Sequence, residues 1–248
     1  MLSLYTLNIL PSKQALSNLP KGKLLINTIN AHSYNVAQED ALFADALQNG
    51  DVLTPDGASI VHACRWLNTP SQPKERVAGW DVFIHEMTTL AKRAEAEHTH
   101  PTVFFMGSSP GVLQRIKERA VLDFPQLKIV TYSPPYKPEF SPEDNIAILS
   151  AINAANPDLL WIGMTAPKQE KWTYSHWQDL NIHCHVGTIG AVFDFYAGTA
   201  KRAPLWWQRH SLEWLYRLLT EPRRMWRRYI IGNALFIHNI LKEKRAKR

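Results

Sequence analysis

The sequence is poor in cysteine, with only Cys64 and Cys184 among its 248 residues. Two cysteines are too few for the disulfide framework of a small secreted domain, and the low number is typical of a protein in a reducing cytoplasm. His62 and Cys64 do not have the spacing of a zinc site. We therefore expect a cytoplasmic protein that is not held together by disulfides or structural zinc.

Long apolar runs are also missing. The longest run near the carboxy end, Tyr229 to Leu241, is interrupted by Asn233, His238 and Asn239. A helix that spans a bilayer needs roughly 20 predominantly apolar residues. We expect no segment of the chain to cross a membrane.

Three motifs of nucleotide and metal chemistry are absent. No G-x-G-x-x-G follows the first strand-like run and no Walker A sequence is present, which argues against an NAD-dependent oxidoreductase and against a P-loop enzyme. No D-x-D pair is present to hold a divalent cation against phosphates. The turn from Gly107 to Gly111 offers free amides that suit a phosphate, although most such turns only connect two elements. We expect no metal and no other cofactor.

What the sequence does contain is an uneven distribution of charge. Residues 201–248 hold 13 Lys and Arg against 3 Glu, whereas the first 200 residues hold 15 basic and 19 acidic groups. Arg beside interfacial Trp is typical of a segment that rests on an anionic membrane surface. Packing of these tryptophans on the rest of the chain, and nucleic-acid binding, are the alternatives. The tryptophans of this basic tail are Trp206, Trp207, Trp214 and Trp226.

Strand-like apolar runs alternate with helical patterns through the first 200 residues. This alternation predicts an α/β fold, with a Rossmann-like, mainly parallel sheet and helices on both faces. A single helix is expected over Asn35–Gln48. Strands are expected at Leu24–Thr28, Asp51–Leu53, Thr102–Met106, Lys128–Tyr132, Leu159–Gly163 and Ile182–Val186.

From Leu205 onward the pattern is helical throughout, and Pro222 suits the first turn of a helix. The sequence therefore predicts two parts. Residues 1–204 form an α/β domain, and residues 205–248 form a C-terminal helical, basic appendage that associates with membranes.

Polar residues at two strand ends suit a binding pocket. Thr28 and Asn30 end the first strand-like run, and Asp56 follows the second. Open α/β sheets bind ligands outside the carboxyl ends of their strands, so Asp56 is a candidate general base. The plain alternative is an N-cap, which stabilises a helix by about 1 kcal/mol. A helix N-terminus also favours the ionised carboxylate, so we expect a base of modest strength.

Several ordered blocks between residues 24 and 228 carry a resemblance to a known family. They are Ile29-Asn30-Ala31, Thr54-Pro55-Asp56-Gly57, Arg76-Val77-Ala78-Gly79-Trp80-Asp81, Gly163 to Glu170, Val186-Gly187 through Phe193 to Gly198, Lys201-Arg202-Ala203-Pro204, and Glu213 to Leu218. In order and spacing, these blocks resemble the WecG/TagA/CpsF glycosyltransferases.

The resemblance implies an inverting, metal-independent transferase of bacterial cell-envelope or exopolysaccharide synthesis. Such enzymes move a sugar from a UDP-sugar to a saccharide on polyprenyl diphosphate, at the cytoplasmic face of the membrane. Matched by motif, Asp56 is the general base, Thr28 and Asn30 line the pocket, and Arg76 and Gln169 contact substrate. In the family's appendage, arginines are proposed to reach the diphosphate, and the best matches here are Arg217, Arg224 and Arg227.

Elementary chemistry agrees with this assignment. An inverting transfer needs a base for the acceptor hydroxyl and positive charge for the departing nucleoside diphosphate. Arginine forks and helix amides can supply that charge without a metal ion, and the tail is rich in arginine. From the residues alone, however, Arg76 also fits a surface cation and Gln169 a helix cap.

Three questions stay open at the level of sequence. The donor can carry N-acetylmannosamine, its uronic acid, glucose or glucuronic acid. A homo-oligomer is compatible with the sequence, and the appendage can act on its own pocket or on a neighbour's.

The competing class of function is a non-catalytic α/β protein that binds a nucleotide and uses its tail for nucleic acid or a partner. We expect a membrane surface rather than nucleic acid.

Overall fold

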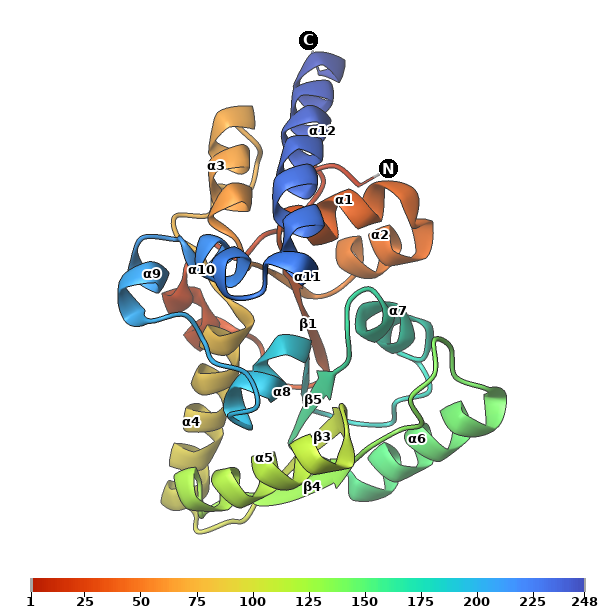
Figure 1. Cartoon of the computed structure of the whole chain (residues 1–248). Coiled ribbons are helices and arrows are strands. Elements are labelled where there is room, and N and C mark those ends of the chain that lie inside the picture. Colours follow the sequence, from red (N-terminus) through yellow and green to blue (C-terminus); the bar gives the residue numbers. More distant parts are fainter. Residues whose placement is uncertain (1, 248) are drawn as a thin grey trace.

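The computed structural model describes residues 2–247, except for the side chain of Arg224. Six strands form one sheet in the order β2-β1-β6-β5-β3-β4, and every neighbouring pair is parallel. Helices lie on both faces of this sheet (Figure 1), which confirms the predicted α/β fold. The strands are β1 (Leu24–Ile29), β2 (Val52–Pro55), β3 (Thr102–Gly107), β4 (Lys128–Tyr132), β5 (Leu159–Gly163) and β6 (His185–Thr188).

Successive residues of each strand point to opposite faces, so each strand feeds two cores. In β3, Val103 and Phe105 pack into one core, and Phe104 and Met106 into another. The first face is covered by the 3₁₀ turn η1 (Lys13–Asn18), α4 (Gly79–Glu97), α5 (Pro110–Asp123) and α8 (Gly190–Tyr196). The opposite face is covered by α1 (Ala31–Glu39), α2 (Ala41–Gln48), α3 (Ala58–Leu67), α6 (Pro142–Ala155) and α7 (Lys168–Ser175).

Two predicted elements differ from the structure. The single helix expected over Asn35–Gln48 is divided into α1 and α2, because the Asp40 carboxylate accepts the Phe43 amide at 3.0 Å and so caps a new helix. The last strand lies at His185–Thr188 rather than Ile182–Val186, since pairing with β1 and β5 begins only at its first residue. The buried apolar residues Ile182 and Cys184 lie before β6, and Cys184 only accepts the Leu24 amide at 3.3 Å without belonging to the strand.

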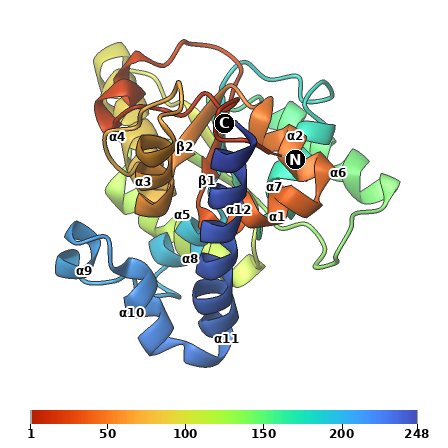
Figure 2. The same ribbon diagram turned by 90° about the horizontal axis from the view of Figure 1, so that it is seen from above.

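The chain after residue 204 is helical, as expected. Its elements are α9 (Leu205–Arg209), α10 (Glu213–Thr220), α11 (Pro222–Trp226), the π-helical turn η2 (Arg227–Ile231) and α12 (Gly232–Ala246). α12 packs along α1, whereas α9 and α10 extend beyond the sheet (Figure 2). α9 and α10 bury none of their residues. Between residues 2 and 247, no helix combines the length and the apolar composition that crossing a bilayer requires.

Phe236 and Ile240 hold α12 on the body of the molecule. Phe236 is 6% exposed, and its ring meets Tyr34 edge-on with the ring centroids 5.4 Å apart. Replacing Phe236 with Ala is expected to lower the free energy of unfolding by about 3 to 5 kcal/mol, because a cavity replaces a buried ring. Urea unfolding measures this change. Ile237→Ala, at a neighbouring position that is 59% exposed, is the matched control and should change stability by less than about 0.5 kcal/mol.

Candidate active site

The structure brings Asp56 and Asn30 together at the carboxyl ends of β2 and β1. The Asp56 amide donates to the Ile29 carbonyl oxygen at 2.8 Å, which ties the two strand ends to each other. The Asn30 side chain also forms a hydrogen bond with the Asp56 carboxylate. Asn30 Oδ1 accepts the amides of His32 and Ser33, so the same residue caps α1. The helix cap therefore fixes Asn30 beside the candidate base.

Asp56 does not cap α3, which was the alternative suggested by its position. Gly57 is the N-cap residue, and no side chain caps this helix. The half-buried Asp56 carboxylate instead lies among charged groups from three other segments, which are Arg76, Glu213 and Arg228. Contacts between residues far apart in the sequence thus build the site.

Burial raises the pKa of Asp56 to about 6, from an ordinary value of 3.8. Loss of hydration is the largest effect, Arg76 and Arg228 lower this pKa, and Glu213 raises it. The expectation of a base of modest strength is therefore wrong, because burial outweighs the charges of Arg76 and Arg228. A carboxylate with a pKa of about 6 is mostly ionised at neutral pH and still basic enough to accept a proton from a bound hydroxyl.

Arg76 connects the candidate base to the tail. Its Nη1 atom donates to Glu213 Oε2 at the start of α10, and its charge also acts on Asp56. Arg202 Nε donates to the other oxygen of the same carboxylate, Oε1, at 3.3 Å. The side chains of Arg76, Arg202 and Glu213 are only 18% to 20% exposed. A three-membered ion cluster therefore joins α10 to the segment before α4.

Arg228 in η2 is a site residue that the sequence patterns missed. Its charge lowers the pKa of Asp56. Burial lowers the pKa of His32, and the charge of Arg228 lowers it further. The Arg228 guanidinium therefore lies near both residues. Neighbouring residues of a helix differ by about 100° around its axis, and a π-helical turn alters this spacing. Because Arg227–Ile231 is such a turn, no sequence signal separates Arg228 from Arg227.

The three tail arginines predicted to contact a diphosphate lie in different settings. Arg217 is half-buried on α10, one turn after Glu213. Arg227 is exposed, and its guanidinium lies 5.3 Å from the centroid of the Trp226 ring. The side chain of Arg224 lies outside the described residues. Contact of these three arginines with substrate stays a prediction.

The buried Gln169 side chain joins the ends of β5 and β6. Its Oε1 atom accepts the amides of Met164 and Gly190, each at 3.1 Å, and its Nε2 atom donates to Glu170 Oε1 at 2.8 Å. A Cβ at Gly190 would lie 2.0 Å from the Met164 carbonyl oxygen, so this close approach requires glycine. In this arrangement the Gln169 amide bonds protein groups, and its contact with substrate stays a prediction.

Thr28 is half-buried near the end of β1, opposite Thr54 of β2. The residue before it, Asn27, belongs to a buried polar network that the sequence patterns did not identify. Thr188 Oγ1 donates to Asn27 Oδ1 at 2.7 Å, and Asn27 Nδ2 donates to the Ala46 carbonyl oxygen at 2.9 Å. An asparagine within an apolar strand was the available signal, because a buried amide is costly without hydrogen bonds. The network links β1, β6 and α2 next to the pocket residues.

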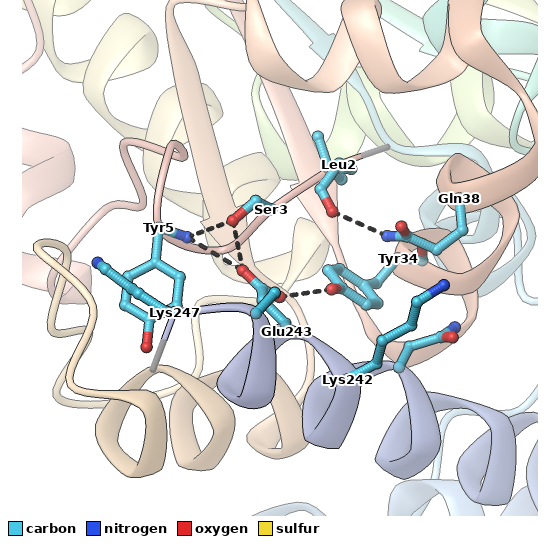
Figure 3. Close-up of a pocket in the computed structure, with 10 residues that line it drawn as sticks. Leu2, Ser3, Tyr5, Tyr34, Gln38, Lys242, Glu243 and Lys247 are labelled. Carbon is cyan, nitrogen blue, oxygen red and sulfur yellow. Dashed lines mark hydrogen bonds between the residues drawn. The ribbon is translucent and has the colours of Figure 1, made fainter.

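A cavity of about 360 Å³ lies near the carboxy end of α12, beside α1 and the amino-terminal segment (Figure 3). Glu243 of α12 accepts hydrogen bonds from the Ser3 and Tyr34 hydroxyls and from the Tyr5 amide. None of the predicted site residues lines this cavity. Because its central carboxylate already bonds three protein donors, we interpret the cavity as part of the α12 attachment rather than as the active site.

Two comparisons relate the sequence of the chain to known proteins. A sequence model of the glycosyl transferase WecG/TagA/CpsF family matches residues 6–248. The chain is 30% identical over 224 residues to an N-acetylglucosaminyldiphosphoundecaprenol N-acetyl-beta-D-mannosaminyltransferase of Bacillus subtilis, covering 90% of this chain and 81% of the relative. A protein of the same name from Bacillus spizizenii is 31% identical over 226 residues, covering 91% of this chain and 81% of the relative.

Proposed function

The chain belongs to the WecG/TagA/CpsF family of glycosyltransferases, and we propose that it transfers a sugar from a UDP-sugar to a saccharide on polyprenyl diphosphate. The product would serve bacterial cell-envelope or exopolysaccharide synthesis. The names of the two Bacillus relatives specify an acceptor on undecaprenyl diphosphate, which supports a lipid-linked acceptor here. Among the four donor sugars left open by the sequence, the same names favour N-acetylmannosamine.

The observation that carries the proposal is a half-buried carboxylate at the carboxyl ends of parallel strands, near the charges of Arg76 and Arg228. Burial raises its pKa to about 6. In an inverting transfer, Asp56 takes the proton of the acceptor hydroxyl as the hydroxyl oxygen bonds to the anomeric carbon. The bond from that carbon to the UDP oxygen breaks in the same step. A single displacement, from the face of the sugar opposite to UDP, inverts the configuration at the anomeric carbon. Such a reaction needs only one general base.

The departing UDP carries negative charge on its diphosphate, and guanidinium groups stabilise it. Arg76 and Arg228 lie beside Asp56 and supply part of this charge. Other arginines of the tail supply the remaining positive charge in our proposal, because the tail brings them to the membrane-borne acceptor. The proposed substrate-binding residues are Thr28, Asn30, Arg76, Gln169, Arg217, Arg224 and Arg227.

We divide the chain into a catalytic domain, residues 1–204, and an appendage, residues 205–248, that docks on the inner face of the bacterial membrane. The appendage exposes large apolar side chains beside its basic residues, a composition suited to an anionic lipid surface. Attachment would be peripheral, through side chains rather than a spanning helix. The exposed apolar residues are Leu205, Trp206, Trp214, Leu219, Trp226, Ile230, Ile231, Leu235, Ile237 and Leu241.

The function is tested by offering single UDP-sugars with a short-chain polyprenyl-diphosphate amino-sugar acceptor. We expect one donor to release UDP and to give a glycolipid whose mass increases by that sugar, with N-acetylmannosamine as the first candidate. Anomeric analysis of the product should show inversion. No product from any UDP-sugar, together with single-stranded DNA binding at least as tight as binding to anionic lipid, would instead favour the non-catalytic alternative.

Removal of divalent metal is expected to leave turnover unchanged. Guanidinium groups, rather than a divalent cation, neutralise the leaving diphosphate in this proposal. The residues that the structure describes bring together no group of three or more His, Cys, Asp or Glu side chains suited to a metal. Initial rates after EDTA treatment, with Mg²⁺ or Mn²⁺ restored in parallel samples, give the comparison. A rate that EDTA abolishes and either cation restores would overturn metal independence.

A further inference from the structure

Glu213 is the first residue of α10, and its carboxylate bonds two arginines from different parts of the chain. Arg76 comes from the connection between α3 and α4, and Arg202 from the segment before α9. The resemblance to the family assigned no role to Glu213 or Arg202. The cluster is largely enclosed, since each of the three side chains is at most 20% exposed.

The body of the molecule supports one side of this cluster. The Arg202 guanidinium lies 5.3 Å from the centroid of the Trp80 ring, and Trp80 packs against Phe83 and Tyr196 of the core. α10 itself buries none of its residues. The two bonds of Glu213 are polar contacts that attach the first turn of α10 to the body.

Three carboxylates act on the Arg76 guanidinium, and the hydrogen bond of Arg76 goes to one of them, Glu213. The other two, Asp56 and Asp81, act on it through space. The groups that face Asp56 are Arg76 from the segment before α4, Glu213 from α10, Arg228 from η2 and Asn30 from the end of β1. Without Glu213, Asp56 would be the natural partner for the Arg76 guanidinium.

We propose that Glu213 is a positioning residue that holds Arg76 away from a direct ion pair with Asp56 and fixes α10 over the strand ends. This role rests on the proposed function of Asp56 as the base. An Arg76–Asp56 ion pair would stabilise the ionised carboxylate and weaken it as a proton acceptor. The same contact fixes α10, the helix that carries Arg217. Docking of the tail and the proton affinity of Asp56 are therefore coupled.

Replacing Glu213 with Gln removes the charge and keeps the size of the side chain. We expect the pKa of Asp56 to fall by about one unit, because a repelling charge is lost and Arg76 turns toward the base. The acidic limb of the pH–rate profile should move to lower pH with it, and kcat at neutral pH should fall by up to about tenfold, since a weaker base accepts the proton less readily. Glu213→Asp, which keeps the charge, should recover most of both properties.

The matched control is Glu221→Gln, which removes the same charge from the tail at the start of α11. It should leave the pH–rate profile in place. The pKa of Asp56 can be followed without turnover by carbon NMR of protein labelled at aspartate carboxyl groups, with Asp56→Asn identifying the signal. An unchanged Asp56 titration in folded Glu213→Gln would overturn the inference.

These outcomes separate the inference from the proposed function. If Asp56→Asn is inactive and Glu213→Gln leaves both titration and rate unchanged, only the role of Glu213 fails. If Asp56→Asn has the wild-type rate, the proposed function of Asp56 fails, whatever the NMR titration of Glu213→Gln gives. A tenfold loss of rate in Glu213→Gln without any movement of the pKa would mean that Glu213 only supports α10, which contradicts its proposed effect on the base.

Discussion

Replacing Asp56 with Asn is expected to lower kcat by at least about a hundredfold at neutral pH. Asn has nearly the same shape and can keep the hydrogen bond to Asn30, but it cannot accept the proton of the acceptor hydroxyl. In the wild type, the rate should fall as the pH drops below about 6, because protonation of Asp56 removes the base. The residual rate of the variant should lack this acidic limb. Initial rates across a pH series measure both effects.

The stability of Asp56→Asn shows whether the variant is correctly folded, and so provides the control for its loss of rate. The pKa of Asp56 is raised in the folded state, so the ionised carboxylate opposes folding. This destabilisation grows as the pH rises from the unfolded value near 3.8 to about 6, and it is fully present above that. Asp56→Asn should therefore be more stable than the wild type at pH 7, by roughly 1 to 3 kcal/mol. A folded variant that turns over at the wild-type rate would exclude Asp56 as the base.

Replacing Trp206, Leu219 and Ile230 together with Ser is expected to weaken binding to anionic vesicles at least about a hundredfold. The side chains are 57%, 64% and 59% exposed. Burying each one in the lipid interface contributes roughly 1.5 kcal/mol or more, and a tenfold change in affinity corresponds to about 1.4 kcal/mol. Turnover of a short-chain, water-soluble acceptor should persist, since none of the three is a proposed site residue. Vesicle flotation and soluble-acceptor rates measure the two effects.

Exposed apolar residues of the sheet domain provide the matched control. Val121, Leu122 and Ile146 are 50%, 80% and 65% exposed, and replacing them together with Ser should leave vesicle binding unchanged. Deletion of the whole tail is less informative, because it also removes Phe236 and Ile240 from a buried core. If the tail variant still floats with the vesicles, or if the control loses binding equally, the appendage is not the membrane anchor.

Much of the fold could be predicted from the sequence because buried parallel strands are short apolar runs between helical patterns. Such runs locate β1, β3 and β5 to within a residue or two. The displaced β6 shows the limit of such predictions, since Ile182 and Cys184 are buried beside the sheet but lie outside the strand. Apolar character reports burial, whereas strand bounds depend on hydrogen-bond register. Asp40 divides a predicted helix for a similar reason, as a polar residue inside an apolar pattern can begin a new helix.

The candidate site was predictable only where its residues follow strands. Asp56 and Asn30 could be placed together because the carboxyl ends of neighbouring parallel strands meet at one edge. The sequence could not place three other residues at the site, because they reach it through the packing of the chain after residue 200. They are Arg202, Glu213 and Arg228. Their spacing in the sequence carries no trace of that packing. The raised pKa of the base likewise depends on burial that only the assembled tail and sheet create.

The most direct test of the account is a crystal structure of the protein with UDP bound. We predict that the nucleotide lies outside the carboxyl ends of β1 and β2, with guanidinium groups such as Arg76 bonded to its diphosphate. The Asp56 carboxylate should face the space that the transferred sugar and the acceptor hydroxyl would occupy. A nucleotide bound elsewhere, for example in the cavity beside Glu243, with Asp56 remote from it, would contradict the account.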